Sequence, residues 1–127
     1  MSIFSNIFGS SEKENEFNNK VNWIPLTFLG QLDEIVAFSN QNPIVIFKHS
    51  TRCSISRFAL KQFEREFDFE VDAYFLDLIE YREISNEIAT RFNVQHQSPQ
   101  LLLIKDGKSV YDVSHSDIDA GELKSKL

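Results

Sequence analysis

The stretch Phe47-Lys48-His49-Ser50-Thr51-Arg52-Cys53-Ser54-Ile55-Ser56 decides how the chain is organised. It begins at the end of the apolar run 44–47, which predicts a strand buried on both faces of a sheet. Beyond Cys53, apolar residues recur at helical spacing through Phe67. The sequence therefore predicts a strand, a turn and a helix that carries the only cysteine of the chain in its first turn.

A thiol at the start of a helix is well placed for thiolate chemistry. Backbone N–H groups and the positive end of the helix dipole stabilise the charged sulfur there. Arg52, Lys48 and His49 lie within a few residues of Cys53 and are candidates to stabilise the thiolate. A lone cysteine can equally act as a small buried hydrophobic residue. From this stretch alone, both interpretations remain open.

Composition and charge narrow the classes of function. A length of 127 residues is enough for one domain with a sizeable core. The net charge of −6 argues against nucleic-acid and anionic-membrane partners, because binding phosphate requires clustered cations. No apolar stretch approaches the roughly 18 residues of a membrane span, and the first residues lack the features of a signal peptide. We expect a cytoplasmic protein, where a working free thiol can be kept reduced.

The order of expected elements predicts an α/β fold. Residues 1–20 mix polar residues with isolated phenylalanines and predict a mobile N-terminal arm, and residues 21–127 form the domain. We expect strands over 21–26, 44–47, 69–78, 101–104 and 109–114, and helices over 29–40, 54–67, 84–93 and 116–126. Thr27 and Ser116 are the expected N-caps of the first and last helices. This alternation predicts a three-layer α/β/α sandwich with a mixed central sheet.

Two local signals shape the second half of the domain. Pro99 directly precedes a predicted buried strand and requires a special backbone, for which a cis Ser98-Pro99 peptide bond is one solution. Asp106-Gly107 is a hairpin signal, so the segment 109–114 should return antiparallel to the strand before it.

Several segments together resemble the YtxJ-like proteins of the bacillithiol system, also called monothiol bacilliredoxins of the C type, within the thioredoxin-like superfamily. The resemblance runs from about Trp23 to Leu127. The segments that carry it are Phe47-Lys-His-Ser-Thr-Arg-Cys-Ser-Ile-Ser56, Tyr74-Phe-Leu-Asp77, Arg82-Glu-Ile-Ser-Asn86 and His96-Gln-Ser-Pro-Gln100. It implies a thioredoxin-like fold and the transfer of bacillithiol, a low-molecular-weight thiol, on and off protein cysteines.

The resemblance also implies roles for individual residues. Cys53 would be the nucleophile, and Ser56 stands where a dithiol thioredoxin has its resolving cysteine. A mixed disulfide at Cys53 would therefore need a thiol from outside the chain. Two positions depart from relatives: Phe47 stands where dithiol thioredoxins keep a buried carboxylate, and Ser54 where many relatives have proline.

Four further residues are expected to bind substrate by the same resemblance. The backbone of Ser98 would pair with the substrate chain, and Pro99 would keep that edge open. Ser116 and Asp117 start the last predicted helix, whose free N–H groups are a candidate anion site, although these residues can simply cap the helix.

The leading hypothesis is a monothiol thiol–disulfide oxidoreductase that removes bacillithiol or a similar low-molecular-weight thiol from S-thiolated cytosolic proteins. That thiol would be a co-substrate, and no bound cofactor or metal is expected, since His49, His96 and His115 match no tetrahedral zinc spacing with Cys53. We expect a monomer that can form a Cys53-linked dimer on oxidation. The alternatives are a catalytically idle adaptor that binds a peptide beside Cys53 and Pro99, and a protein whose Cys53 is itself the target of modification.

Overall fold

The computed structural model describes residues 21–127. The predicted arm over residues 1–20 lies outside the described residues. The described strands are β2 (Trp23–Pro25), β3 (Ile44–His49), β4 (Asp72–Asp77), β5 (Gln100–Lys105) and β6 (Lys108–Ser114). The described helices are α2 (Gly30–Phe38), α3 (Ser54–Glu66), α4 (Arg82–Arg91) and α5 (Ala120–Lys126), with a 3-10 turn, η1 (His115–Asp117), before α5.

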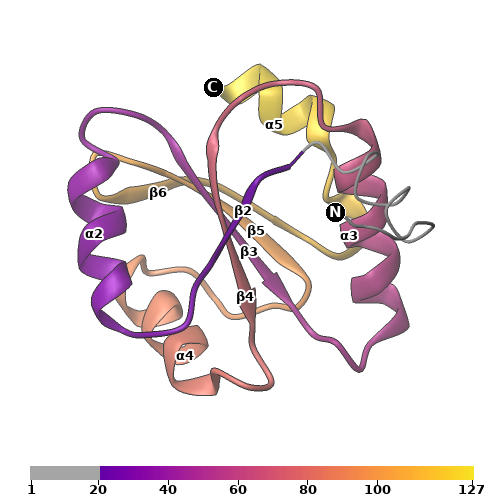
Figure 1. Ribbon diagram of the computed structural model, residues 1–127, viewed down its shortest axis with the longest axis horizontal. Helices are drawn as coiled ribbons and strands as arrows, with labels where there is room; N and C mark the ends of the chain where they lie inside the picture. The colour runs from indigo at the N-terminus through magenta and orange to yellow at the C-terminus, as the bar shows by residue number, and fades with distance from the viewer. Residues whose placement is uncertain (1–20) are drawn as a thin grey trace, which may run out of the picture.

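The sheet is mixed and has the order β2-β4-β3-β5-β6. Strands β2 and β3 both pair with β4 in parallel, whereas β5 runs antiparallel to β3 and β6 antiparallel to β5. Helices α2 and α4 cover one face and α3 and α5 the other (Figure 1). The predicted three-layer sandwich is confirmed, and the short strand β2, which contains Pro25, lies at one edge of the sheet.

Strand β3 is buried along its whole length, as its apolar run predicts. Its side chains alternate between two cores, because successive residues of a strand point to opposite faces. Ile44 and Ile46 pack on the side of α2 and α4, and Val45 and Phe47 on the side of α3 and α5. The carboxyl end of β3 therefore sends Lys48 and His49 to opposite faces of the sheet.

An aromatic cluster fixes α3 on its face of the sheet. Trp23 packs within 5.8 Å of Phe47 and 6.0 Å of Phe63, measured between ring centroids. The Trp23 indole N–H also donates to Glu64 of α3, at 2.6 Å. Part of the phenylalanine content is thus used to hold the helix that carries the cysteine.

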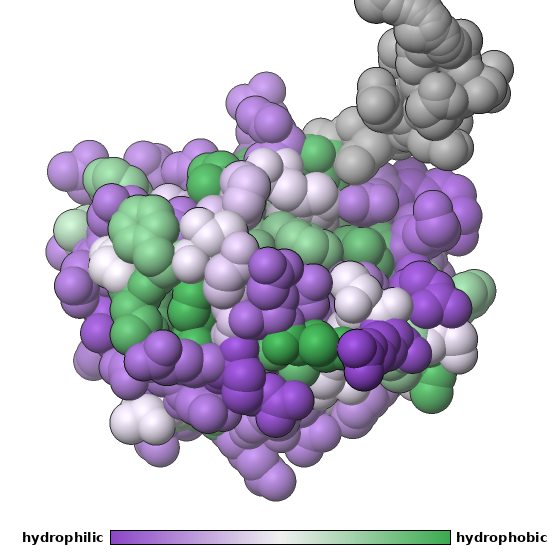
Figure 2. Space-filling model, turned by 60° about the horizontal axis from the view of Figure 1, so that its bottom comes forward, coloured by the Kyte–Doolittle hydropathy of each residue, from purple (hydrophilic) through white to green (hydrophobic). Residues whose placement is uncertain are grey.

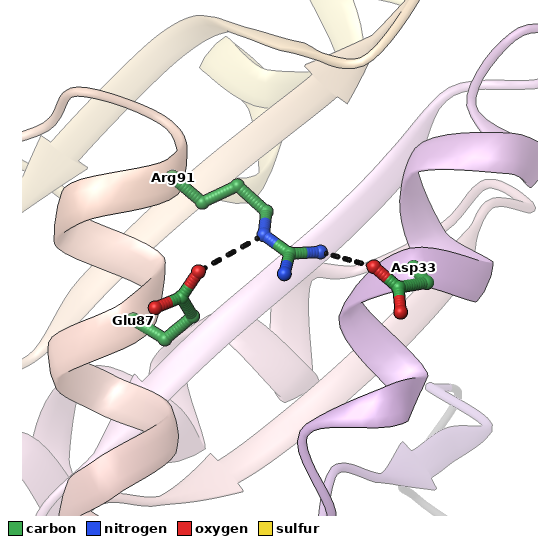
Figure 3. Close-up of polar contacts among 3 residues, drawn as sticks. All are labelled: Asp33, Glu87 and Arg91. Carbon is green, nitrogen blue, oxygen red and sulfur yellow. Dashed lines mark hydrogen bonds and ion pairs between the residues drawn. The ribbon is translucent and has the colours of Figure 1, made fainter.

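The outer helices α2 and α4 are tied by a guanidinium between two carboxylates. Arg91 Nη1 lies 2.8 Å from Asp33 Oδ1 of α2, and Arg91 Nε lies 3.2 Å from Glu87 Oε2 within α4 (Figure 3). The hydrogen bond with Asp33, followed by that with Glu87, raises the pKa of Arg91. Since all three side chains are partly solvated, this network contributes only modestly to stability.

Both predicted N-caps are wrong. Helix α2 begins at Gly30 and not after Thr27, and the Gln31 side chain supplies the missing acceptor: its Oε1 takes the N–H groups of Thr27 and Phe28 at 2.7 and 3.1 Å. The last helix begins at Ala120 and is capped by Asp119, whose Oδ1 accepts from Gly121 at 2.7 Å. A short polar residue caps a helix only where the backbone enters that helix. His115, with a φ of 59°, changes the direction of the chain before Ser116, so the helix begins only after Asp119.

The predicted hairpin at Asp106-Gly107 is confirmed, and both residues have positive φ, 52° and 75°. A Cβ at Gly107 would also lie 3.3 Å from Val36 Cγ1. We expect Gly107→Ala to lower the free energy of unfolding by about 1–2 kcal/mol, because L residues are strained in this conformation.

Gly30→Ala is the matched control, since a Cβ there meets only ordinary contacts with Phe28 at the start of a helix. Chemical denaturation of both variants checks the expectation. Equal stabilities of the two variants would contradict it.

Candidate functional site

Cys53 is the N-cap residue of α3, which confirms its predicted place at a helix start. Its N–H donates to Ser50 O at 3.2 Å, and its C=O accepts the N–H of Arg57 at 3.0 Å. The side chain is partly exposed and, among the described residues, makes no capping hydrogen bond. Cys53 therefore stands at the end of α3 where the N–H groups of the first turn are free, which is the position in a helix that favours a thiolate.

The turn before Cys53 is held by Ser56, which is fully buried. The Ser56 hydroxyl accepts the N–H of Ser50 at 3.0 Å and lies 2.8 Å from His49 Nδ1. Ser56 thus links the end of β3 to the first turn of α3, a contact called here the Ser56 clasp.

His49 is buried and packs on Phe75, with ring centroids 5.4 Å apart. Desolvation by burial lowers its pKa from 6.5, and Arg57 adds to this effect while Asp77 opposes it. The ring thus carries less positive charge near neutral pH than an exposed histidine, which runs against its predicted role beside the thiolate.

Lys48 lies on the other face of the sheet from α3 and is fully buried. Its Nζ lies 2.9 Å from His96 Nδ1, and desolvation lowers its pKa from 10.5 to about 8. The structure therefore gives Lys48 a partner away from the helix that carries Cys53. Arg52 is exposed beside Cys53, and its predicted effect on the thiolate remains a prediction.

The predicted substrate-binding segments lie next to each other. The Ser98-Pro99 peptide bond is cis. Pro99 O accepts the N–H of His115 at 3.1 Å, which brings η1, and with it Ser116 and Asp117, beside the Pro99 loop. Among residues 21–127, the backbone N–H and C=O of Ser98 make no hydrogen bond. These two groups could pair with an extended substrate chain.

Ser116 and Asp117 do not start a helix. Both are exposed in η1, and helix α5 begins three residues after Asp117. The predicted anion site on helix N–H groups is therefore not formed at these two residues.

The surface at the carboxyl ends of β2, β3 and β4 is mixed in polarity. This edge lies at the bottom of Figure 1 and comes forward in Figure 2, where apolar patches are separated by polar side chains. Ile55 and Phe58 of α3 are exposed, as are Phe28 and Leu29 before α2. Within the described residues, no group of three or more metal-ligating side chains is placed to hold a metal ion. The same part of the chain has no helix long and apolar enough to cross a bilayer.

Sequence reasoning missed three residues near the site. Arg57 donates to Thr51 O at 3.1 Å and so closes the turn before Cys53, although its position suggested only an outer helix face. Gln100 is buried, and its Nε2 donates to Gln95 O at 3.0 Å. His96 opens one of the segments that carry the resemblance, but no local pattern indicates its contact with Lys48. The pairing of β3 with β5, which places Lys48 opposite Gln100, is the signal that would have linked these groups.

The fold and the single thiol at a helix start define a thioredoxin-like protein with a one-cysteine site. A structure of a candidate oxidoreductase with a thioredoxin fold is 30% identical, with a TM-score of 0.72, and the match covers 81% of this chain and 91% of that one. A thioredoxin from Schistosoma mansoni is 19% identical (TM-score 0.61, covering 83% and 92%), and a mutant thioredoxin from Halobacterium salinarum is 16% identical (TM-score 0.59, covering 83% and 87%). These two show the shared fold alone.

The family model of the monothiol bacilliredoxin BrxC matches residues 24–123. The chain belongs to this family, and its chemistry is accordingly thiol redox chemistry.

If the Ser56 hydroxyl links β3 to α3, removing that hydroxyl should lower the stability of the protein. Ser56→Ala leaves Ser50 N–H and buried His49 Nδ1 without their partner, so we expect the free energy of unfolding to fall by about 1–3 kcal/mol. Ser54→Ala, at an exposed position two residues earlier, is the control. Chemical denaturation that finds the two variants equally stable would rule out the clasp.

The buried lysine predicts a pH dependence of stability. Folded Lys48 releases its proton near pH 8, whereas in the unfolded chain it keeps it up to about 10.5. Unfolding therefore takes up a proton between these values, and stability should rise with pH by about 1–2 kcal/mol from about pH 8 to about pH 9.5. Urea denaturation of the wild type and of Lys48→Met across this pH range measures how the free energy of unfolding of each depends on pH. If the free energies of the two proteins change with pH in the same way, Lys48 is not a buried amine that titrates in this range.

Proposed function

We propose that this protein removes bacillithiol, or a similar low-molecular-weight thiol, from mixed disulfides on protein cysteines through Cys53. The observation that carries the proposal is the pairing of a partly exposed Cys53 at the head of α3 with a buried Ser56 at the resolving position. With one cysteine in the chain, an internal disulfide is impossible. Membership of the monothiol bacilliredoxin family supports the choice of co-substrate.

The first step is an exchange between one thiolate and one disulfide. The Cys53 thiolate attacks the low-molecular-weight sulfur of the mixed disulfide, a new disulfide forms at Cys53, and the client sulfur leaves as a thiolate that takes up a proton. The N–H groups of the first turn of α3 stabilise the attacking thiolate, and the exposed Arg52 beside it adds positive charge.

The second step returns Cys53 to its reduced form. A thiol from outside the chain attacks the low-molecular-weight sulfur, so that Cys53 leaves as the thiolate and the incoming thiol is oxidised to a new disulfide. In each cycle one mixed disulfide is consumed and one is formed, because the second thiol takes the place of the client cysteine as the partner of the low-molecular-weight thiol. The clients are S-thiolated proteins, and the backbone of Ser98 is the group proposed to align the substrate chain.

Replacement of the nucleophile tests the proposal. Cys53→Ser should release the low-molecular-weight thiol from a bacillithiolated test protein no faster than buffer with the recycling thiol alone. The release is followed by intact-protein mass spectrometry, with Ser54→Ala as the control that keeps the nucleophile. Activity that persists in Cys53→Ser would refute the mechanism, and a wild type that does not react would favour the idle adaptor.

The absence of a resolving thiol gives a second test. Ser56→Cys should trap part of the oxidised protein as an internal disulfide, visible as a loss of two hydrogens, because this position lies three residues after Cys53 in the first turn of α3. Ser54→Cys places a thiol nearby on an exposed position and serves as the comparison. If Ser56→Cys retains the low-molecular-weight thiol as fully as the wild type, residue 56 is not the resolving position.

A further inference from the structure

Lys48 is an unusual residue for the interior of this domain. It is fully buried, and within residues 21–127 no carboxylate pairs with it. Burial of an ammonium group without a counter-ion is costly. Its one hydrogen-bond partner among the described residues is His96 Nδ1, at 2.9 Å. Because an ammonium group can only donate, His96 Nδ1 must be unprotonated and accept.

His96 lies in the loop that joins α4 to β5, residues 92–99, and this loop ends in Ser98 and Pro99. The loop is anchored from beneath by two strand residues that face each other in the sheet. Lys48 holds His96, and its register partner Gln100 donates to Gln95 O at 3.0 Å. The loop, whose end residues Phe92 and Pro99 are buried, is therefore also attached to the central strands through the buried side chains of Lys48 and Gln100.

The surroundings of His96 favour its role as a neutral acceptor. Desolvation lowers its pKa from 6.5, and Lys48 of β3 and Arg82 of α4 lower it further through their positive charges. Ser85 of α4 adds a longer contact, with its Oγ 3.5 Å from Nδ1. These effects favour the neutral ring, which lies between Lys48 of β3 and Ser85 of α4.

We propose that Lys48 is a positioning residue, which acts through His96 to hold the 92–99 loop so that the Ser98 backbone can align a protein disulfide with Cys53. This inference rests on the proposed function. Lys48 then supports the loop that carries Ser98 and does not stabilise the Cys53 thiolate. The Lys48 amine contacts His96 and lies on the opposite face of the sheet from α3.

Substitutions of His96 test the proposal best, because His96 is exposed and its replacement should not prevent folding. His96→Gln keeps an acceptor for Lys48, and His96→Leu removes it. We expect His96→Leu and Lys48→Met to raise KM for a bacillithiolated protein roughly fivefold to tenfold with little change in kcat, and His96→Gln to stay near the wild type. Lys108→Met, an exposed lysine on β6, is the control for loss of charge.

Reaction of Cys53 with a small aromatic disulfide separates loop positioning from an effect on the thiol. This reagent needs no alignment by Ser98, so its rate should stay within about twofold in every variant. The double variant Lys48→Met, His96→Leu should be no worse than His96→Leu alone, since both changes break the contact between Lys48 and His96. An equal loss with the small disulfide, or an unchanged KM in His96→Leu, would overturn the proposal.

Amide hydrogen exchange of the loop gives a measurement that does not depend on turnover. The amides of Asn93 and Val94, which donate to Thr90 O and Ala89 O at 3.4 and 3.1 Å, should exchange faster in His96→Leu than in His96→Gln, because the contact with Lys48 is lost only in the first. If the wild type shows no exchange chemistry, the proposed function fails while this comparison still tests the contact. Equal exchange rates in the two variants would show that Lys48 does not hold the loop.

Discussion

The site depends on two consecutive polar side chains at the end of a strand that is otherwise apolar. The alternation of β3 sends Lys48 to the α2 and α4 face and His49 to the α3 face. His49 contacts Ser56, which holds the turn before Cys53. Lys48 contacts His96, which holds the loop that contains Ser98. One strand end thereby fixes both walls of the site, and a slip of one residue in the register of β3 would exchange the two contacts.

The core supports this arrangement from the side of α3. Phe47 occupies the strand position below the cysteine helix and packs against Trp23 and Phe63. An apolar ring at this position cannot relay a proton, and Ser56 above it cannot form a disulfide. Because neither Phe47 nor Ser56 can take part in redox chemistry, Cys53 is left as the reactive group. The polar side chains around it hold the backbone in place.

Sequence patterns predicted the parts of the fold that depend on periodicity and turn chemistry. The apolar run of β3, the stripe of α3 and the Asp106-Gly107 turn were sufficient for the layered sheet and for Cys53 at a helix start. The predicted start of the last helix was wrong, because nothing in the sequence marks the positive φ of His115.

The partners of Lys48 could not be predicted for a different reason. Lysine is rarely buried without a carboxylate, so a charged residue beside Cys53 suggested a solvated cation near the sulfur. Its contact with His96 depends on two segments that are 48 residues apart in sequence. Such a contact follows from the pairing of β3 and β5, which the local pattern of either segment does not contain.

The most direct test of the account is the fate of the low-molecular-weight thiol in a single turnover. Equimolar bacillithiolated test protein and reduced wild-type chain are mixed without a second thiol, quenched with acid and weighed by intact-protein mass spectrometry. We predict that the chain gains the mass of one bacillithiol at Cys53 as the client returns to its reduced mass. A covalent complex between chain and client, or an unmodified chain with a fully thiolated client, would contradict it.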